Sequence, residues 1–265
     1  MKLDIRQPHN PSEFRDIEIL EQMIWQIDHG VDAETMMAIH KSGGVVLLAY
    51  DLDADATKPI GFALSFVGLT TEGKVKHHSH MAGVVAEYRD KNVGYLLKLA
   101  QREVVLKQGV TTHMTWTCDP LESRNANFNF HKLGATCNTY YVNLYGDMGG
   151  INEGLPSDRF QADWFLNSER VKERLQGVKS SVSGNDVKVI SSNENRPVDD
   201  WTLGAEKVWL EIPANFQELR VNDKELALAW RMVTREVFIT AFSEGYAVTD
   251  FIFEQGRGYY VLEFI

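Results

Sequence analysis

The chain has little cysteine, and it lacks the long apolar runs that membrane proteins carry. Its 265 residues include only Cys118 and Cys137, which are too few for a disulfide framework and lack metal-ligand spacing. No run approaches the roughly 18 apolar residues of a membrane-spanning helix, and the first ten residues contain no apolar signal-peptide segment. We therefore expect a protein of the reducing cytoplasm, away from membranes, with two free thiols.

Positive charge is also scarce, which argues against a nucleic-acid binder. The formal net charge is −10, whereas a protein that binds backbone phosphates needs a basic face. Residues 89–107 are the exception, because five Lys and Arg against two acidic residues give this stretch a local charge of +3. A basic segment in an acidic chain suits a small anionic ligand.

Several catalytic motifs are absent. The sequence contains no G-x-x-x-x-G-K-[ST], G-x-G-x-x-G, H-E-x-x-H or G-x-S-x-G, so NTPases, dinucleotide enzymes, zinc proteases and serine hydrolases lose their main support. His77, His78 and His80 are clustered, but alternate residues of a strand point to opposite faces. Two histidines without a nearby carboxylate or thiol are a weak ligand set, so we expect no metal.

The elements that are present predict an α/β fold with a mixed sheet. Apolar and β-branched runs predict strands, and apolar residues at spacings of three and four predict helices. Strands are expected at 3–7, 44–51, 60–68, 77–86, 110–119 and 135–146, and helices at 12–27, 93–109 and 120–134. Residues 1–146 therefore form a predicted core.

Residues 147–265 are expected to form a C-terminal α/β extension packed against that core. It should hold a helix carrying Phe160, Trp164, Val171 and Leu175, then a polar loop region with a short strand at 187–190. A strand at 207–213, a helix at 222–244 and a hairpin turning at 255–258 complete it.

The stretch "YRDKNVGYLL" (88–97) predicts an anion site at the junction of a strand and a helix. A tight turn after a strand aims backbone N–H groups into one concavity, and the helix N-terminus adds partial positive charge. The turn needs a left-handed residue, and Asn92 is the best choice after glycine. The alternative is a plain strand-to-helix connection.

This stretch also resembles a known family. "VVAEYRDKNVGYLLK" is similar to the acyl-CoA-binding motif Q/R-x-x-G-x-G/A of the GNAT (Gcn5-related) N-acyltransferases. Arg89 matches the first position, Asn92 replaces the first glycine and Gly94 matches the last. "RNANFNFHKLGA" (124–135) resembles the family's second signature, and the longer chain resembles a larger bacterial subgroup with a C-terminal extension.

The resemblance implies an acyl-CoA donor, either acetyl-CoA or succinyl-CoA, with no metal. Backbone groups of Val84, Val85 and Ala86 would contact the pantetheine. The pyrophosphate would be held by Arg89, Asp90, Lys91, Asn92, Val93, Gly94 and Tyr95. Asn125 would bond the cofactor arm or cap its helix.

The family often places a general base on the strand before the motif, which here points to histidine. His80 is the first candidate and His78 the second, both expected on the same face as Ala82 and Val84. The alternative for each is a structural strand histidine.

The leaving-group acid departs from the family pattern. Many members have a tyrosine where this chain has Phe130, and a phenyl ring cannot donate a proton. Tyr140, Tyr141 and Tyr145, on the following strand, are candidate substitutes, and Tyr145 is the one selected. The alternative for each is a side chain of the core or its rim. For substrate binding, Arg159 would clamp a carboxylate of the acceptor or acyl group, and Trp116 would form a pocket wall. The alternative for Arg159 is an internal ion pair with Asp158 or Asp163.

Together these features predict transfer of an acyl group to the amine of a small molecule, with an amino acid as a candidate. Two alternatives stay open: a non-catalytic acyl-CoA sensor and a protein lysine acetyltransferase. Neither nucleic acid nor membrane is an expected partner, and a homodimer is left open.

Overall fold

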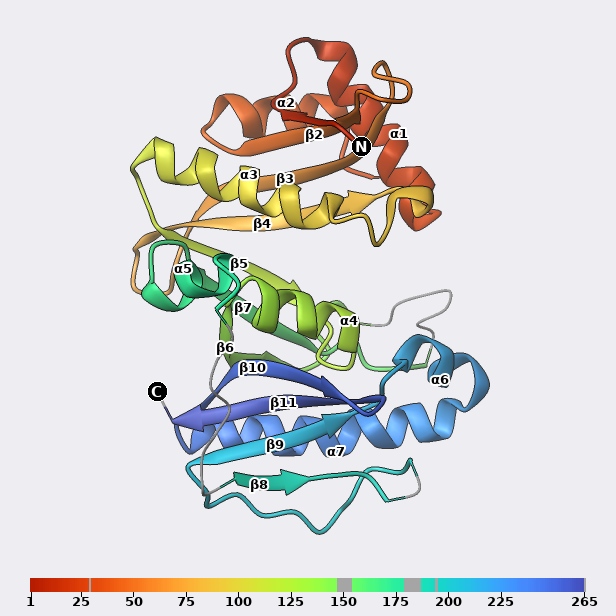
Figure 1. Cartoon of the computed structure of the whole chain (residues 1–265), viewed down its shortest axis with the longest axis vertical. Helices are drawn as coiled ribbons and strands as arrows, with labels where there is room; N and C mark the ends of the chain where they lie inside the picture. Colours follow the sequence, from red (N-terminus) through yellow and green to blue (C-terminus); the bar gives the residue numbers. More distant parts are fainter. Residues whose placement is uncertain (29, 147–153, 179–186, 194, 265) are drawn as a thin grey trace. The chain divides into compact units, whose positions relative to one another are not determined.

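The computed structural model describes residues 1–28, 30–146, 154–178, 187–193 and 195–264, and it has the mixed α/β architecture predicted from the sequence. The chain packs as two compact units, Met1–Trp116 and Thr117–Ile265. Figure 1 shows the helices and strands of each unit. The expected boundary at residue 146 separates a family core from its extension, and it stays a prediction.

The first unit is built on a sheet in the order β1-β2-β3-β4-β5. Its strands are β1 (Leu3–Arg6), β2 (Val45–Asp51), β3 (Pro59–Leu69), β4 (Val75–Val84) and β5 (His113–Cys118). Neighbouring strands are antiparallel except for β5, which joins β4 in parallel. The helices are α1 (Pro11–Trp25), α2 (Ala33–Lys41) and α3 (Val93–Gln108), with the short 3-10 helix η1 (Ala86–Tyr88) before α3.

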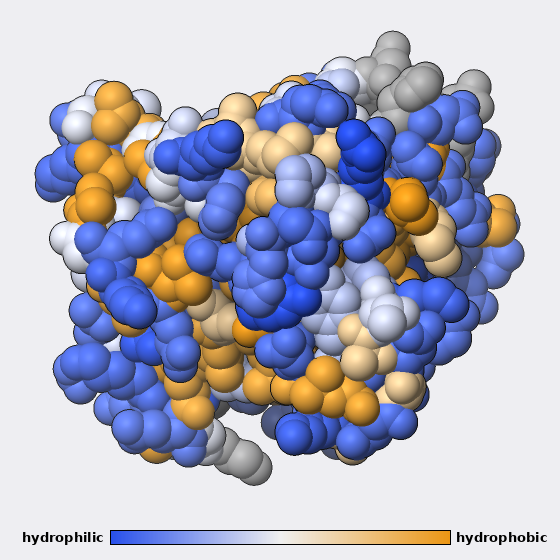
Figure 2. All heavy atoms as spheres, turned by 90° about the horizontal axis from the view of Figure 1, so that it is seen from above, coloured by the Kyte–Doolittle hydropathy of each residue, from blue (hydrophilic) through white to orange (hydrophobic). Residues whose placement is uncertain are grey.

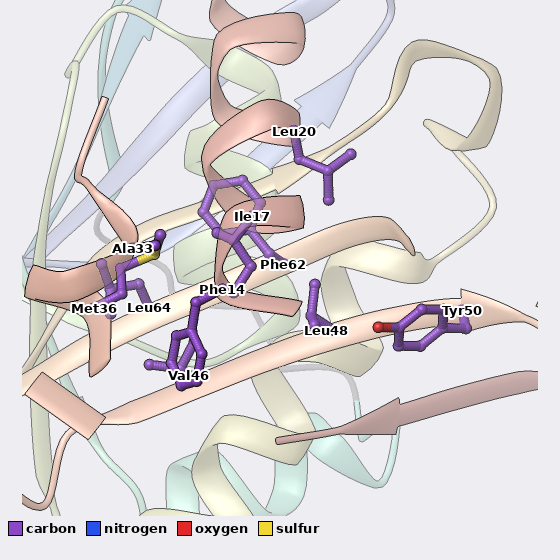
Figure 3. Close-up of a cluster of buried hydrophobic side chains, with 10 residues drawn as sticks. All are labelled: Phe14, Ile17, Leu20, Ala33, Met36, Val46, Leu48, Tyr50, Phe62 and Leu64. Carbon is purple, nitrogen blue, oxygen red and sulfur yellow. The ribbon is translucent and has the colours of Figure 1, made fainter. Parts of the chain in front are cut away.

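A hydrophobic cluster joins α1 and α2 to one face of this sheet (Figure 3). Alternate residues of β2 and β3 point into it, because side chains of a strand alternate between faces. The cluster contains Phe14, Ile17, Leu20, Ala33, Met36, Val46, Leu48, Tyr50, Phe62 and Leu64. All of β2 is buried, so its other residues face the layer that holds α3.

A β-bulge in β4 changes which face its side chains join. Ser79 pairs with Ser65 and Met81 pairs with Leu64, so His80 has no opposite residue. Before the bulge, His78 shares a face with Phe66. After it, Ala82 and Val84 pair with Ala63 and Gly61, which lie on the opposite face. As a result, even-numbered residues of β4 lie on one face of the sheet before the bulge and on the other face after it.

The second unit has a sheet in the order β7-β6-β10-β11-β9-β8. Its strands are β6 (Thr136–Tyr141), β7 (Arg159–Phe165), β8 (Val187–Ile190), β9 (Lys207–Ile212), β10 (Tyr246–Glu254) and β11 (Arg257–Phe264). Its helices are α4 (Ser123–Ala126), which continues as the π-helix η2 (Asn127–Lys132), α5 (Glu169–Leu175), α6 (Phe216–Asn222) and α7 (Lys224–Ser243). The predicted closing hairpin is confirmed, with Gln255 and Gly256 at its turn.

One predicted element of the second unit is wrong. Phe160 and Trp164 were expected on a helix, yet Arg159–Phe165 is the strand β7 and only Glu169–Leu175 is helical. Phe160, Ala162 and Trp164 are buried in alternation. A spacing of four residues fits both the helical period and two repeats of the strand period, so it cannot separate the two.

The surface carries hydrophobic side chains interspersed among hydrophilic ones (Figure 2). The exposed apolar residues of the first unit include Ile19, Met23 and Trp25 on α1. Single exposed apolar residues are normal on soluble proteins and identify no partner by themselves. Within the described ranges, no helix combines the length and apolar character needed to cross a membrane.

Candidate functional site

The stretch between β4 and α3 makes two left-handed backbone bends. Asp90 has φ 65° and Asn92 has φ 62°, whereas Tyr88 and Arg89 close the preceding 3-10 turn through bonds to the carbonyls of Val85 and Ala86. The left-handed conformation expected at Asn92 is confirmed, with ψ 8°. Asp90 is a second such residue that the sequence pattern did not indicate.

These bends leave the N-terminus of α3 uncapped. The amide of Leu96 donates to the Asn92 carbonyl at 3.0 Å, which is the first bond of the helix ladder. Among the described residues, no protein acceptor bonds the amides of Asn92, Val93, Gly94 and Tyr95, and Asn92 makes no side-chain capping bond. Four N–H groups at a helix N-terminus, together with the helix dipole, form an anion-binding geometry.

Gly94 keeps this N-terminus accessible. A Cβ atom built there would approach only Val84 Cγ2, at 3.8 Å, which is ordinary contact. The packing of the protein therefore does not require glycine at this position, and its backbone conformation does not require it either. Glycine would permit a ligand to approach the backbone closely here.

The edge of β4 is open beside this turn. Within the described residues of the first unit, β5 pairs with β4 only at His77–Met114 and His78–Thr115, although β4 continues to Val84. The peptide groups of β4 beyond His78 on that side therefore lack a strand partner. An extended ligand can bind such an edge as an added strand would.

The basic side chains near the turn are partly held in place. Arg89 is exposed and its Nε lies 3.5 Å from the Val84 carbonyl oxygen. Lys91 Nζ lies 4.6 Å from the centre of the Tyr88 ring, whose hydroxyl donates to Asp51. Both cations are thus available to solvent at the loop that holds the uncapped amides.

The three residues expected to contact pantetheine are not equivalent. The amide of Val85 donates to the Ile60 carbonyl at 3.0 Å, so it cannot donate to a ligand. Its carbonyl accepts from Tyr88, and the Ala86 carbonyl accepts from Arg89. Val84 pairs with Gly61 of β3, which leaves the other side of its peptide toward the open edge.

The two candidate base histidines lie together, but not on the predicted face. The rings of His78 and His80 both contact Phe66, with centres 5.2 and 5.8 Å away, on the face opposite Ala82 and Val84. The bulge at His80 is the physical reason for this correction. Burial lowers the pKa of His78 to about 4, and partial burial of its ring also lowers the pKa of the more exposed His80.

A buried polar group under β4 was missed by the sequence reasoning. Lys98 of α3 donates to Ser79 Oγ at 2.7 Å, and its Nζ lies 3.9 Å from the centre of Trp116. Ser79 in turn donates to Gln101 at 3.0 Å. Trp116, the expected pocket wall, is 6% exposed and covered by Lys98. The apolar face predicted for this helix gave no signal for a buried lysine.

The other candidates lie in the second unit. Asn125 is exposed on α4. Tyr145 is 55% exposed, and its hydroxyl lies 2.8 Å from Thr117 Oγ1. Phe130 is fully buried, with its ring against Phe160 and Tyr260. It therefore belongs to the core, where it could contact no reacting atom.

Arg159 forms an ion pair with Asp119, a partner that the sequence did not indicate. Its Nη1 lies 3.5 Å from the Asp119 carboxylate and 2.7 Å from the main-chain carbonyl of Asp158. The Asp158 carboxylate accepts instead from Arg235 and Tyr140. In the part of the chain that the structure describes, no group of three or more His, Cys, Asp or Glu side chains could hold a metal.

Two solved structures are similar to this chain in overall fold. Arabidopsis thaliana NAA60 in complex with acetyl-CoA is similar at 16% identity, over 63% of this chain and 100% of that chain, with a TM-score of 0.50. The NatC complex bound to Gag peptide and CoA is similar at 14% identity, over 62% and 98%, with a TM-score of 0.50. The chain has the GNAT fold. No family model and no curated protein matches the sequence.

The GNAT fold confirms the architecture implied by the motif at Arg89, Asn92 and Gly94. It fits the uncapped amides at α3 and the open edge of β4, which together could hold a diphosphate and an extended arm. The larger bacterial subgroup stays a prediction, as do the individual roles of the site residues.

Proposed function

We propose that the chain is an N-acyltransferase that moves an acetyl or succinyl group from acyl-CoA to the amine of a small molecule, with an amino acid as the first candidate acceptor. One observation carries this proposal: the four unbonded amides of residues 92–95 follow a left-handed Asn92 at the start of α3. They offer a diphosphate both hydrogen bonds and a favourable dipole.

Acyl-CoA, when bound, supplies a thioester carbonyl that an amine can attack. The amides of Asn92, Val93, Gly94 and Tyr95 would bind its diphosphate, and Arg89 and Lys91 would add positive charge. The open peptide edge of β4 would bind the extended arm, with Val84 contributing and the Val85 amide excluded by its bond to Ile60. Asp90, Ala86 and Asn125 keep supporting roles in the proposal.

His80 would accept the proton that the acceptor amine loses. Its lowered pKa keeps the imidazole neutral at pH 7, so its ring nitrogen can accept a proton. His78, whose pKa is about 4, is the weaker base. We therefore rank His80 above His78.

Phe130 has no proton to donate to the leaving thiolate, so another residue must supply one or the thiolate departs unprotonated. Tyr145 is the proposed donor because its side chain is exposed. A CoA thiolate is also a sufficiently good leaving group to depart without a dedicated acid. Arg159 is proposed to bind the carboxylate of the acceptor or the acyl group, alongside its contact with Asp119.

The test is release of free CoA thiol. Acetyl-CoA and succinyl-CoA are each combined with a panel of amines, amino acids and one lysine-containing peptide, and calorimetry measures CoA binding in parallel. Thiol release above the uncatalysed rate with a small amine supports the proposal. Release only with the peptide supports a protein lysine acetyltransferase instead.

A non-catalytic acyl-CoA sensor is the second candidate. The buried Phe130 favours it, because the usual donor position is occupied by a core side chain. CoA binding without thiol release for any acceptor, and unchanged binding in His80→Ala, would establish the sensor. Absence of CoA binding contradicts both candidates.

A further inference from the structure

A cavity of about 250 Å³ lies at one end of the second sheet, and the proposed acyl transfer does not use it. β8 runs parallel to β9 and β11 runs antiparallel to it, so the ends of β8 and β9 lie at the same edge as the start of β11 (Figure 1). All described lining residues belong to the second unit. One water needs about 10–15 Å³ of such space, so the cavity has room for a small organic molecule.

Three apolar side chains from neighbouring helices line the cavity. Leu219 of α6 and Leu226 of α7 are half-buried, and Trp230 follows one turn later on α7. The Trp230 Nε1 group donates to the main-chain carbonyl of Asn195 at 3.1 Å, so the polar atom of this ring is already bonded and the ring is held in place. These side chains offer apolar surface on which a ligand could bury an apolar group.

Two opposite charges line the cavity from the strands. Among its described lining residues, only Glu211 of β9 and Arg257 of β11 are charged, and Arg257 Nη1 lies 3.3 Å from Glu211 Oε2. Ser192 holds the buried Glu211 carboxylate through bonds of 2.7 and 2.9 Å from its amide and hydroxyl. A guanidinium has five N–H donors and the Arg257 side chain is 50% exposed, so it retains donors for a ligand.

This pair of charges suits a ligand that carries both signs. In an α-amino acid, the ammonium and carboxylate groups are bonded to the same carbon atom, which matches the close approach of Glu211 and Arg257. A ligand with only a negative charge would be repelled by Glu211, and one with only a positive charge would be repelled by Arg257. A zwitterion is attracted at both ends through charge-assisted hydrogen bonds.

We propose that this cavity binds an apolar α-amino acid such as leucine. The ligand carboxylate accepts from Arg257 and the ligand ammonium group donates to Glu211. The ligand side chain packs against Leu219, Leu226 and Trp230. The site is defined by the second unit alone, and binding there does not depend on the transfer of acyl groups.

The test is calorimetric titration of the full chain with L-leucine in the absence of CoA. Three comparison ligands each lack one feature of leucine. Isocaproate lacks the ammonium group, isoamylamine lacks the carboxylate, and glycine lacks the apolar side chain. Each should bind about tenfold or more weakly than leucine, because each loses one of the three proposed contacts.

Two variants alter the cavity and one leaves it intact. Arg257→Gln removes the guanidinium, and Leu226→Asn replaces an apolar lining group by a polar one. Lys207→Gln is the matched control, because Lys207 belongs to the same sheet, pairs with Glu263 and does not line the cavity. Circular dichroism and thermal unfolding establish that each variant folds, and if Leu226→Asn does not fold, Arg257→Gln decides.

Saturable leucine binding is expected, weakened about tenfold or more in Arg257→Gln and Leu226→Asn and unchanged in Lys207→Gln. No saturable binding, equal loss in all three variants, or equal affinity for leucine and any comparison ligand would each overturn the proposal. Leucine binding that Arg257→Gln leaves unchanged would place the amino acid elsewhere, such as at the proposed acceptor site, and would also overturn it. None of these outcomes depends on thiol release, so the two proposals fail separately.

Discussion

Gly94 and Asn92 have different reasons for their identities, although they lie two residues apart. Asn92 occupies a left-handed conformation that asparagine tolerates better than other side chains. Gly94 has neither a positive φ nor a crowded neighbourhood. The sequence motif predicts both positions. Only the structure shows that Asn92 is required for its backbone conformation, whereas glycine at position 94 would leave room for a ligand.

Gly94→Ala is therefore expected to fold normally and to lose CoA affinity by about tenfold or more, because the methyl group would occupy the approach to the amides. Calorimetric CoA titration and thermal unfolding measure the two effects. Gly68→Ala is the matched control, since its Cβ would meet no atom within 4 Å. Equal CoA affinity in both variants contradicts the assigned binding loop.

The proposed role of His80 predicts the pH dependence of kcat/KM. The active form is neutral and the pKa lies below 6.5, so activity should be level above pH 6.5 and fall as the pH drops through that lower pKa. His80→Gln should remove this acid limb and reduce kcat/KM by about 10²–10⁴-fold. A fall of kcat/KM near pH 4 that is absent in His78→Gln would instead assign the base to His78.

At the scale of elements, the sequence predicts most strands and helices, but it does not predict the strand β7 or the β-bulge in β4. β2, β3 and α3 follow from apolar runs and spacing, because each buries regular positions. The sequence predicts a helix where the structure has β7, since the four-residue spacing of Phe160 and Trp164 fits both periods. The bulge at His80 adds one residue without an unusual composition, so the face of the histidines could not be predicted.

The link between β1 and α1 predicts how stability responds to acid. Arg6 donates two bonds to Glu13, which lowers the pKa of the carboxyl from 4.5 to about 2. A lowered folded-state pKa stabilises the fold fully above pH 4.5, and this contribution is lost as the pH falls toward 2.

Glu13→Gln should therefore lower the free energy of unfolding by about 1–3 kcal/mol at pH 7. The difference from the unmodified chain should shrink between about pH 4.5 and pH 2. Denaturant titrations at several pH values measure it, with the exposed Glu103→Gln as control. A loss that is constant across this range would show that the ion pair is not its cause.

At the scale of the whole molecule, a net charge of −10 surrounds a basic loop. CoA affinity should consequently weaken severalfold as salt rises from about 0.05 to 0.5 M, because screening acts on the attraction between exposed Arg89, Lys91 and phosphates. Titrations at several ionic strengths test this. Affinity that does not change with salt would indicate that apolar contacts dominate binding.

The ion pairs of the second unit could not be predicted from the sequence. Its polar pairs join residues far apart in the chain, such as Arg231 with Asp119 and Arg235 with Asp158. No local period records such pairings, and the predicted pairing of Arg159 with Asp158 or Asp163 used only near neighbours. The α/β architecture could nevertheless be predicted from the sequence, because the apolar patterns of helices and strands are local.

The surplus residue in β4 also has a consequence for protein engineering. Deleting His80 would restore an unbroken ladder with β3, since the registers on either side differ by one position. The flanking side chains would keep their present layers, so the shortened variant is expected to fold while losing both the bulge and the proposed base.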